Sequence, residues 1–259
     1  MISFTSAEIN AWVAAFFFPL ARILAVLASA PPFNNIGLPP RVRLVLGLAI
    51  AIAITPVLPA IPAVDPASAP GLLILAQQIV IGFALGFALR LVFSAVDLAG
   101  NAISNLMGIG FATSFDPQSA AQTPVISEFL GMLALLTFLA INGHLMVIAT
   151  LAQSFSVLPI GTASLANASW LNIANAGGII FSSAVLLSLP ILVALLITNI
   201  ALGVLVRVAP QLNLFAIGFP VTIMLGFAAL LVSMSHLSTP LQQMFEFGLQ
   251  SMLGYFVIK

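Results

Sequence analysis

The chain is poor in charge and lacks cysteine. Its 259 residues include six basic and six acidic side chains, and charged residues make up only 5% of the sequence. A soluble domain has about 25% charged residues, so this chain cannot cover a water-facing surface. The charges cancel, which leaves no net field to attract nucleic acid. The absence of cysteine excludes disulfides, thiolate metal sites and cysteine nucleophiles.

The N-terminal residues lack a basic region. The first ten, MISFTSAEIN, contain neither Lys nor Arg. A cleaved secretory signal begins with positive charge. We therefore expect the N-terminus to be retained.

Apolar residues are what the chain has in abundance. They make up 62% of the sequence, and the mean hydropathy is +1.25. Spanning a bilayer takes about 20 apolar residues in a helix, and only helices or closed barrels satisfy their backbone in lipid. The alternation typical of barrel strands is absent. The sequence predicts an all-α membrane protein with six spans: Ala11–Ala30, Leu44–Ile61, Gly71–Leu89, Phe129–Leu151, Ile179–Val206 and Phe215–Leu237.

The first two runs are weak spans. Arg22 lies at the centre of the first run, where a charged side chain costs about 3 kcal/mol. The second run ends among prolines at Pro56, Pro59 and Pro62. Such helices need protein neighbours, so we expect the chain to belong to a larger assembly.

The basic residues predict the orientation. Arg41 and Arg43 precede the second run, Arg90 follows the third and Arg207 follows the fifth, whereas Lys259 follows the sixth. Six alternating spans place the four arginines on one face, which the positive-inside rule makes cytoplasmic. Both termini are then predicted to be periplasmic.

A polar segment, Asn167–Asn175, divides the chain between helical units. Residues 1–166 hold four of the runs and an amphipathic stretch, Leu91–Met107. Residues 167–259 hold two runs and a C-terminal amphipathic segment. We expect two parts with this boundary.

The last two runs form a predicted helical hairpin with a polar tip. Pro210 ends the first helix of the hairpin, and Gln211 and Asn213 keep the turn in polar surroundings. Arg207 precedes this turn, so the tip is predicted to face the cytoplasm.

One irregular loop, Met107–Pro124, is too polar to span and yet keeps apolar side chains. Gly108 and Gly110 permit tight bends, and Asp116 before Pro117 favours an extended or turned backbone. The apolar members of the loop are Met107, Ile109, Phe111 and Phe115. Irregular backbone at membrane depth is tolerated only when it is buried in protein or lines an aqueous cavity. The loop is therefore either a plug in a pore or an interfacial loop packed on its own helices.

Two further polar residues lie in or beside apolar runs. Asp97 is either a functional carboxylate or an interfacial group that faces water or pairs with Arg90, and His144 is either a proton relay or a hydrogen-bonding residue between helices. A proton-coupled transporter usually places paired acidic groups at the midplane of matching halves, a pattern that this chain lacks. No spacing of Ser, His and Asp indicates catalysis, and we expect no cofactor and no metal.

Seven blocks of sequence resemble the FliR family of flagellar export-gate proteins, which is related to the T component of virulence secretion systems. In chain order they are PPRVRL, QQIVIGFALGF, DLAG, MGIGFATSFDP, NGHL, SFSVLPIG and RVAPQLNLFAIGFP. The resemblance covers roughly residues 10 to 240. It departs at Gln78, where many relatives carry Glu, so no charge-based role is assigned there.

The resemblance implies a non-enzymatic pore subunit of a gate that secretes unfolded flagellar proteins across the bacterial inner membrane. The chain would correspond to a P-like four-helix part followed by a Q-like hairpin, within a helical cone partly raised toward the periplasm. Its partners would be P-type and Q-type subunits, a B-type switch protein at the Arg207–Asn213 tip, secreted polypeptides and lipid. The residues of the implied pore plug are Met107, Gly108, Ile109, Gly110, Phe111, Phe115, Asp116 and Pro117. The alternatives are an injectisome T component or, in another class, a proton-coupled secondary transporter.

Overall fold

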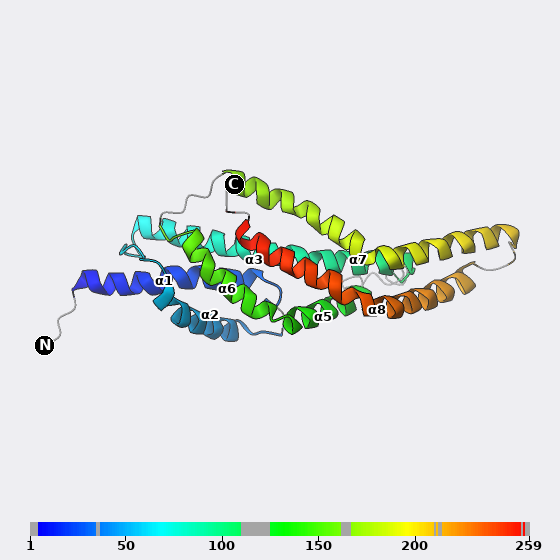
Figure 1. The fold of residues 1–259 in the computed structure, drawn as a ribbon, viewed down its shortest axis with the longest axis horizontal. Coiled ribbons are helices and arrows are strands. Elements are labelled where there is room, and N and C mark those ends of the chain that lie inside the picture. The colour runs from blue at the N-terminus through cyan, green and yellow to red at the C-terminus, as the bar shows by residue number, and fades with distance from the viewer. Residues whose placement is uncertain are drawn as a thin grey trace. The chain divides into compact units, whose positions relative to one another are not determined.

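The computed structural model describes residues 5–34, 37–109, 125–161, 167–209, 211, 214–254 and 256. Across these ranges the regular structure is helical and no strand is present, so the all-α architecture is confirmed (Figure 1). The elements are α1 (Ser6–Ser29), α2 (Pro40–Ile54), η1 (Thr55–Val57), α3 (Ala69–Leu106), α5 (Val125–Ala140), α6 (Gly143–Val157), α7 (Asn167–Val208) and α8 (Leu214–Gly254).

The starts of the first two helices follow from local sequence. At the start of α1, the Thr5 hydroxyl accepts a bond from the Glu8 amide while the Glu8 carboxylate accepts one from the Thr5 amide, which is a capping box. The hydrogen bond from the Thr5 backbone lowers the pKa of Glu8. Helix α2 carries Pro40 at its first position, where a missing amide proton costs nothing.

The helices contribute to two compact units. One comprises residues 1–91, 142–177 and 245–259, and the other comprises residues 92–141 and 178–244. Helices α3, α7 and α8 each contribute residues to both units. These units combine segments that are distant in sequence, whereas the predicted boundary between residues 166 and 167 is defined along the chain. That boundary stays a prediction.

Five described helices are long and apolar enough to cross a membrane: Asn10–Ser29, Pro40–Val57, Ala69–Leu106, Leu171–Val208 and Ile217–Gly254. The predicted fourth span, Phe129–Leu151, is not one straight helix. Its residues fall in α5 and α6, which meet at an angle of 67°. Asn142 between them adopts a left-handed conformation with φ 56, a backbone region that Asn tolerates better than most residues. The count is therefore five spans, or six if the bent pair crosses the membrane.

Two stretches that the sequence places outside the spans belong to long helices. Helix α3 continues through Arg90 and the amphipathic stretch to Leu106, and no proline follows Pro70 within it. The polar segment Asn167–Asn175 forms the first turns of α7 instead of a connector. Hydropathy therefore located the apolar runs but not the ends of these helices.

Candidate functional site

The start of the predicted plug is an ordered turn that ends α3. The Gly108 amide donates to the Asn105 carbonyl oxygen (3.1 Å), and the Ile109 amide donates to that of Ser104 (3.1 Å). Gly108 has φ +79. This pairing around a left-handed glycine is a Schellman motif, so Gly108 stops the helix and redirects the chain.

Side chains from α7 and α8 hold this turn within one unit. The Thr222 hydroxyl donates to the Met107 carbonyl oxygen (3.0 Å). The Asn199 amide nitrogen donates to the Leu106 carbonyl oxygen (3.3 Å). Carbonyls at a helix C-terminus have no partner within the helix, so these two bonds satisfy groups that α3 leaves open. The turn is thereby fixed to both helices.

The Met107 side chain is fully buried. It fills the space beside Gly226 of α8, where an added Cβ would lie 2.7 Å from the Met107 sulfur. The structure thus places Met107 in the core of its unit, while Gly108 and Ile109 are partly exposed. The other predicted plug residues lie outside the described residues: Gly110, Phe111, Phe115, Asp116 and Pro117.

A second polar cluster surrounds Arg22, which is fully buried. Its Nε donates to Gln78 Oε1 (2.8 Å). One terminal nitrogen donates to the carbonyl and hydroxyl oxygens of Ser154 (3.0 and 3.1 Å), and the other donates to the Leu158 carbonyl oxygen (2.8 Å). Residues 154 to 158 end α6. The guanidinium therefore satisfies carbonyls at a helix C-terminus, whose dipole favours a cation.

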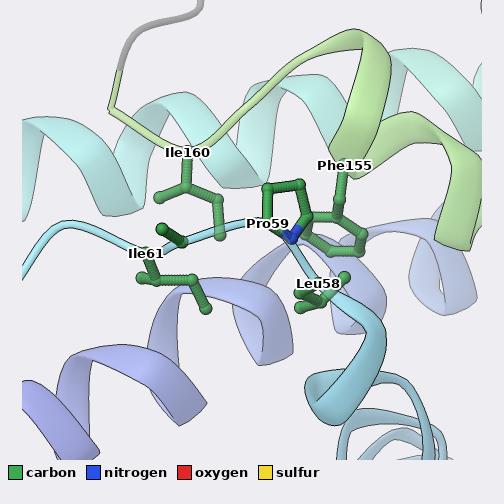
Figure 2. A pocket seen from close by; sticks show the side chains of 6 residues that line it. Leu58, Pro59, Ile61, Phe155 and Ile160 are labelled. Atoms are coloured by element: carbon green, nitrogen blue, oxygen red, sulfur yellow. The ribbon is translucent and has the colours of Figure 1, made fainter.

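The charge of Arg22 is stabilised without an acid among the described residues. Its guanidinium carbon lies 4.2 Å from the centre of the Phe155 ring, a cation–π distance. Figure 2 shows the side chains of Leu58, Pro59, Ile61 and Ile160, which line a small pocket together with Phe155. The pocket has no room for a water molecule, and both Arg22 and Phe155 are fully buried, so the aromatic contact is dry.

Close packing of α1 on α3 brings Arg22 to Gln78. Gly82 and Gly86 lie one and two turns after Gln78 on the same face of α3. A Cβ added at Gly82 would lie 2.6 Å from that of Ala25 on α1. Small residues four apart permit such an approach. The sequence analysis did not predict this close packing of α1 on α3, although the spacing of the two glycines in QQIVIGFALGF indicates it.

The other predicted polar residues lie in separate surroundings. Asp97, on α3, is exposed and accepts bonds from the Ser127 hydroxyl at its backbone oxygen (3.1 Å) and at Oδ1 (3.5 Å). His144 lies in the first turn of α6, two residues after the bend at Asn142. Its Nδ1 is buried and has no hydrogen-bond partner among the described residues.

The predicted hairpin tip lies between the end of α7 at Val208 and the start of α8 at Leu214. Arg207 and Gln211 are exposed. Pro210 and Asn213 lie outside the described residues. The helix break is thus present where the sequence predicts it.

The sequence matches the family described as bacterial export proteins, family 1, over residues 13–248. The chain belongs to this family. It is 43% identical to the flagellar biosynthetic protein FliR of Pectobacterium carotovorum subsp. carotovorum over 89% of this chain and 88% of that one. The FliR of Escherichia coli (strain K12) is 41% identical over 95% and 94%, and that of Bacillus subtilis (strain 168) is 27% identical over 92% and 93%.

Membership of the bacterial export family confirms the predicted resemblance. Together with the flagellar relatives, it makes this chain a component of the flagellar type III export apparatus. Neither the injectisome component nor the proton-coupled transporter is favoured by these matches. The apolar helices and the family place the protein in the bacterial inner membrane.

Proposed function

We propose that this chain is a non-enzymatic pore subunit of the export gate, through which unfolded flagellar subunits pass. Family membership supports the export role. The observation that carries the assignment to a pore is the fixed turn at Met107, which ends α3 at the start of the irregular loop. Such a turn holds one end of the loop at a defined place. The residues after the turn are then available to close the pore.

In this proposal, residues 1–166 form a P-like part and residues 167–259 a Q-like part. They assemble with P-type and Q-type subunits in a helical cone that is partly raised toward the periplasm. The tip at Arg207, Pro210, Gln211 and Asn213 meets a B-type switch protein on the cytoplasmic side. The exposure of Arg207 and Gln211 supports an accessible tip. Both chain termini are periplasmic.

The loop Met107–Pro124 is the plug of this pore, with Phe111 and Phe115 as its main apolar seal. The Schellman turn and the bonds from Asn199 and Thr222 support a fixed entry to the loop. Gly108 is fixed in the turn, whereas Gly110 after it permits tight bends; in this proposal the residues beyond the turn are displaced by a passing polypeptide while the turn stays in place.

Deletion of Gly110–Ala120 tests the plug. The deletion starts after the Met107 turn, so the anchor is retained. We expect the gate to assemble and its host cells to leak ions and small solutes. Assembly is measured by co-purification with the other subunits, and leakage by uptake of a dye that intact cells exclude. A deleted gate that assembles and stays as tight as the wild type would show that this segment is not the plug.

A further inference from the structure

An apolar furrow lies on the unit that contains the N-terminal residues. It has a volume of about 340 Å³ and lies where residues of α1, α3 and α7 meet. Its lining includes Ser29, Val80, Phe83, Phe87, Arg90 and Ile173. Sites for small molecules begin at about 300 Å³, so the furrow has room for one slender ligand.

The polarity of the lining defines the chemistry of that ligand. Val80, Phe83 and Phe87 lie at helical spacing along one face of α3 and are partly exposed. The Ser29 hydroxyl donates to the Ala25 carbonyl oxygen (2.8 Å), so it needs no hydrogen-bond acceptor from the ligand. The one charged group of the lining is the exposed guanidinium of Arg90, which makes no ion pair with another described residue. A matching occupant is apolar along its length and anionic at one end.

The position of Arg90 along α3 matches the depth of a lipid phosphate. Gly71–Leu89 is an apolar run of 19 residues, about 28 Å of helix. This length covers the hydrocarbon layer of about 30 Å. If the run spans that layer, Arg90 reaches the headgroups, where basic pockets between helices bind anionic lipids.

We propose that this furrow binds an anionic phospholipid, with one acyl chain along Val80, Phe83 and Phe87 and the phosphate on Arg90. The furrow is apolar except for the positive charge of Arg90 at one end, which matches a phospholipid with an anionic headgroup. An apolar helix of a neighbouring subunit would leave Arg90 without a partner. The site is independent of the plug, so either proposal can fail alone.

Two pairs of variants test the site in the full chain purified with the subunits that accompany it. Arg90→Gln is matched by Arg41→Gln, which removes the same charge outside the furrow. Phe83→Ala is matched by Phe227→Ala on α8, because both phenylalanines are 47% exposed. Binding is measured after delipidation, with phosphatidylglycerol and phosphatidylcholine of equal chain length, by native mass spectrometry and by the shift in melting temperature.

We expect the wild type to prefer phosphatidylglycerol and Arg90→Gln to lose about tenfold in affinity for it, as the loss of a charge-assisted bond implies. Phe83→Ala should weaken both lipids, and both control variants should match the wild type. Equal binding of the two lipids by the wild type, or equal effects of Arg90→Gln and Arg41→Gln, would overturn the proposal. A photo-reactive residue at position 83 provides a second readout in cells: a lipid adduct supports the site, and a protein adduct refutes it.

Discussion

Gln78→Glu should stabilise the protein, because it replaces an unpaired amide donor beside Arg22 with an oxygen and adds a charge opposite to that of the guanidinium. In the native chain, Gln78 is fully buried and its Oε1 accepts from the Arg22 Nε at 2.8 Å. Its Nε2 is buried without a hydrogen-bond partner among the described residues. A buried polar group without a partner costs about 1–3 kcal/mol. Glu has the same shape, and it puts a carboxylate oxygen in place of the unpaired amide donor, where the oxygen is stabilised by the charge of the Arg22 guanidinium.

The opposing effects can be compared. Burying a carboxylate costs several kcal/mol. A unit charge pair at 4 Å gains about 4 kcal/mol at an effective dielectric constant of 20, which offsets that cost. The relief of the unpaired amide then remains, and we expect a net stabilisation of about 1–2 kcal/mol. For a chain of this size that corresponds to a rise in melting temperature of about 2–8 °C.

The assay is thermal unfolding of the purified full-length chain in mild detergent, followed by near-ultraviolet circular dichroism. Arg22→Met provides the second axis of a double-mutant cycle. In that background the new carboxylate has no counter-charge, so Gln78→Glu should lower the melting temperature instead of raising it. A fall in the wild-type background, or the same sign in both backgrounds, would refute the role assigned to Arg22.

Two glycines yield further predictions. Gly226→Val should displace the Met107 side chain, whose Cγ lies 2.6 Å from an added Cβ, and so increase dye uptake through the gate. The control Gly203→Val, where nothing lies within 4 Å of an added Cβ, should leave dye uptake unchanged. Equal dye uptake by the two variants would contradict the role of the Met107 turn in holding the plug. Gly100→Ala should lower the melting temperature, since its Cβ would lie 2.8 Å from the Ser127 amide nitrogen. Gly177→Ala, in open space, should be neutral or stabilising by up to about 1 kcal/mol; a Gly100→Ala variant as stable as this control would show that α3 and α5 do not pack so closely.

How much the sequence could predict depended on the range of the interaction. Local signals succeeded: Gly108 ends a helix, and the turn near Gln211 separates two helices. The partners of Arg22 lie 56 to 136 residues away along the chain. Composition and periodicity predict that a buried arginine needs partners, but they do not identify which carbonyls supply them.

The bend at Asn142 was missed for a different reason. Asn142 and Gly143 are favourable for a turn, but they lie within the apolar run Phe129–Leu151, whose average hydropathy outweighs them. The result is two helices of 16 and 15 residues. They are about 24 and 22 Å long, and each is too short to cross a bilayer by itself. The predicted orientation therefore depends on whether the bent pair crosses as one span.

The distribution of arginine and lysine does not distinguish these topologies. If the pair crosses, Arg41, Arg43, Arg90 and Arg207 share one face and Lys259 lies opposite. If it turns back, Arg207 changes sides and Lys259 joins the other three arginines. Either way the positive-inside rule finds four basic residues against one.

Labelling of cysteines with an impermeant thiol reagent resolves the topology, and the chain has no native cysteine to interfere. Asn34→Cys, exposed between α1 and α2, reports the face that Arg41 shares in both topologies. Gln211→Cys reports the hairpin tip. Our proposal expects both to react only from the cytoplasmic side, because a cytoplasmic tip requires that α5 and α6 cross together. Reaction of Gln211→Cys from the periplasm, with Asn34→Cys still cytoplasmic, would show that the pair turns back, and the contact proposed between the tip and a B-type switch protein would then be wrong.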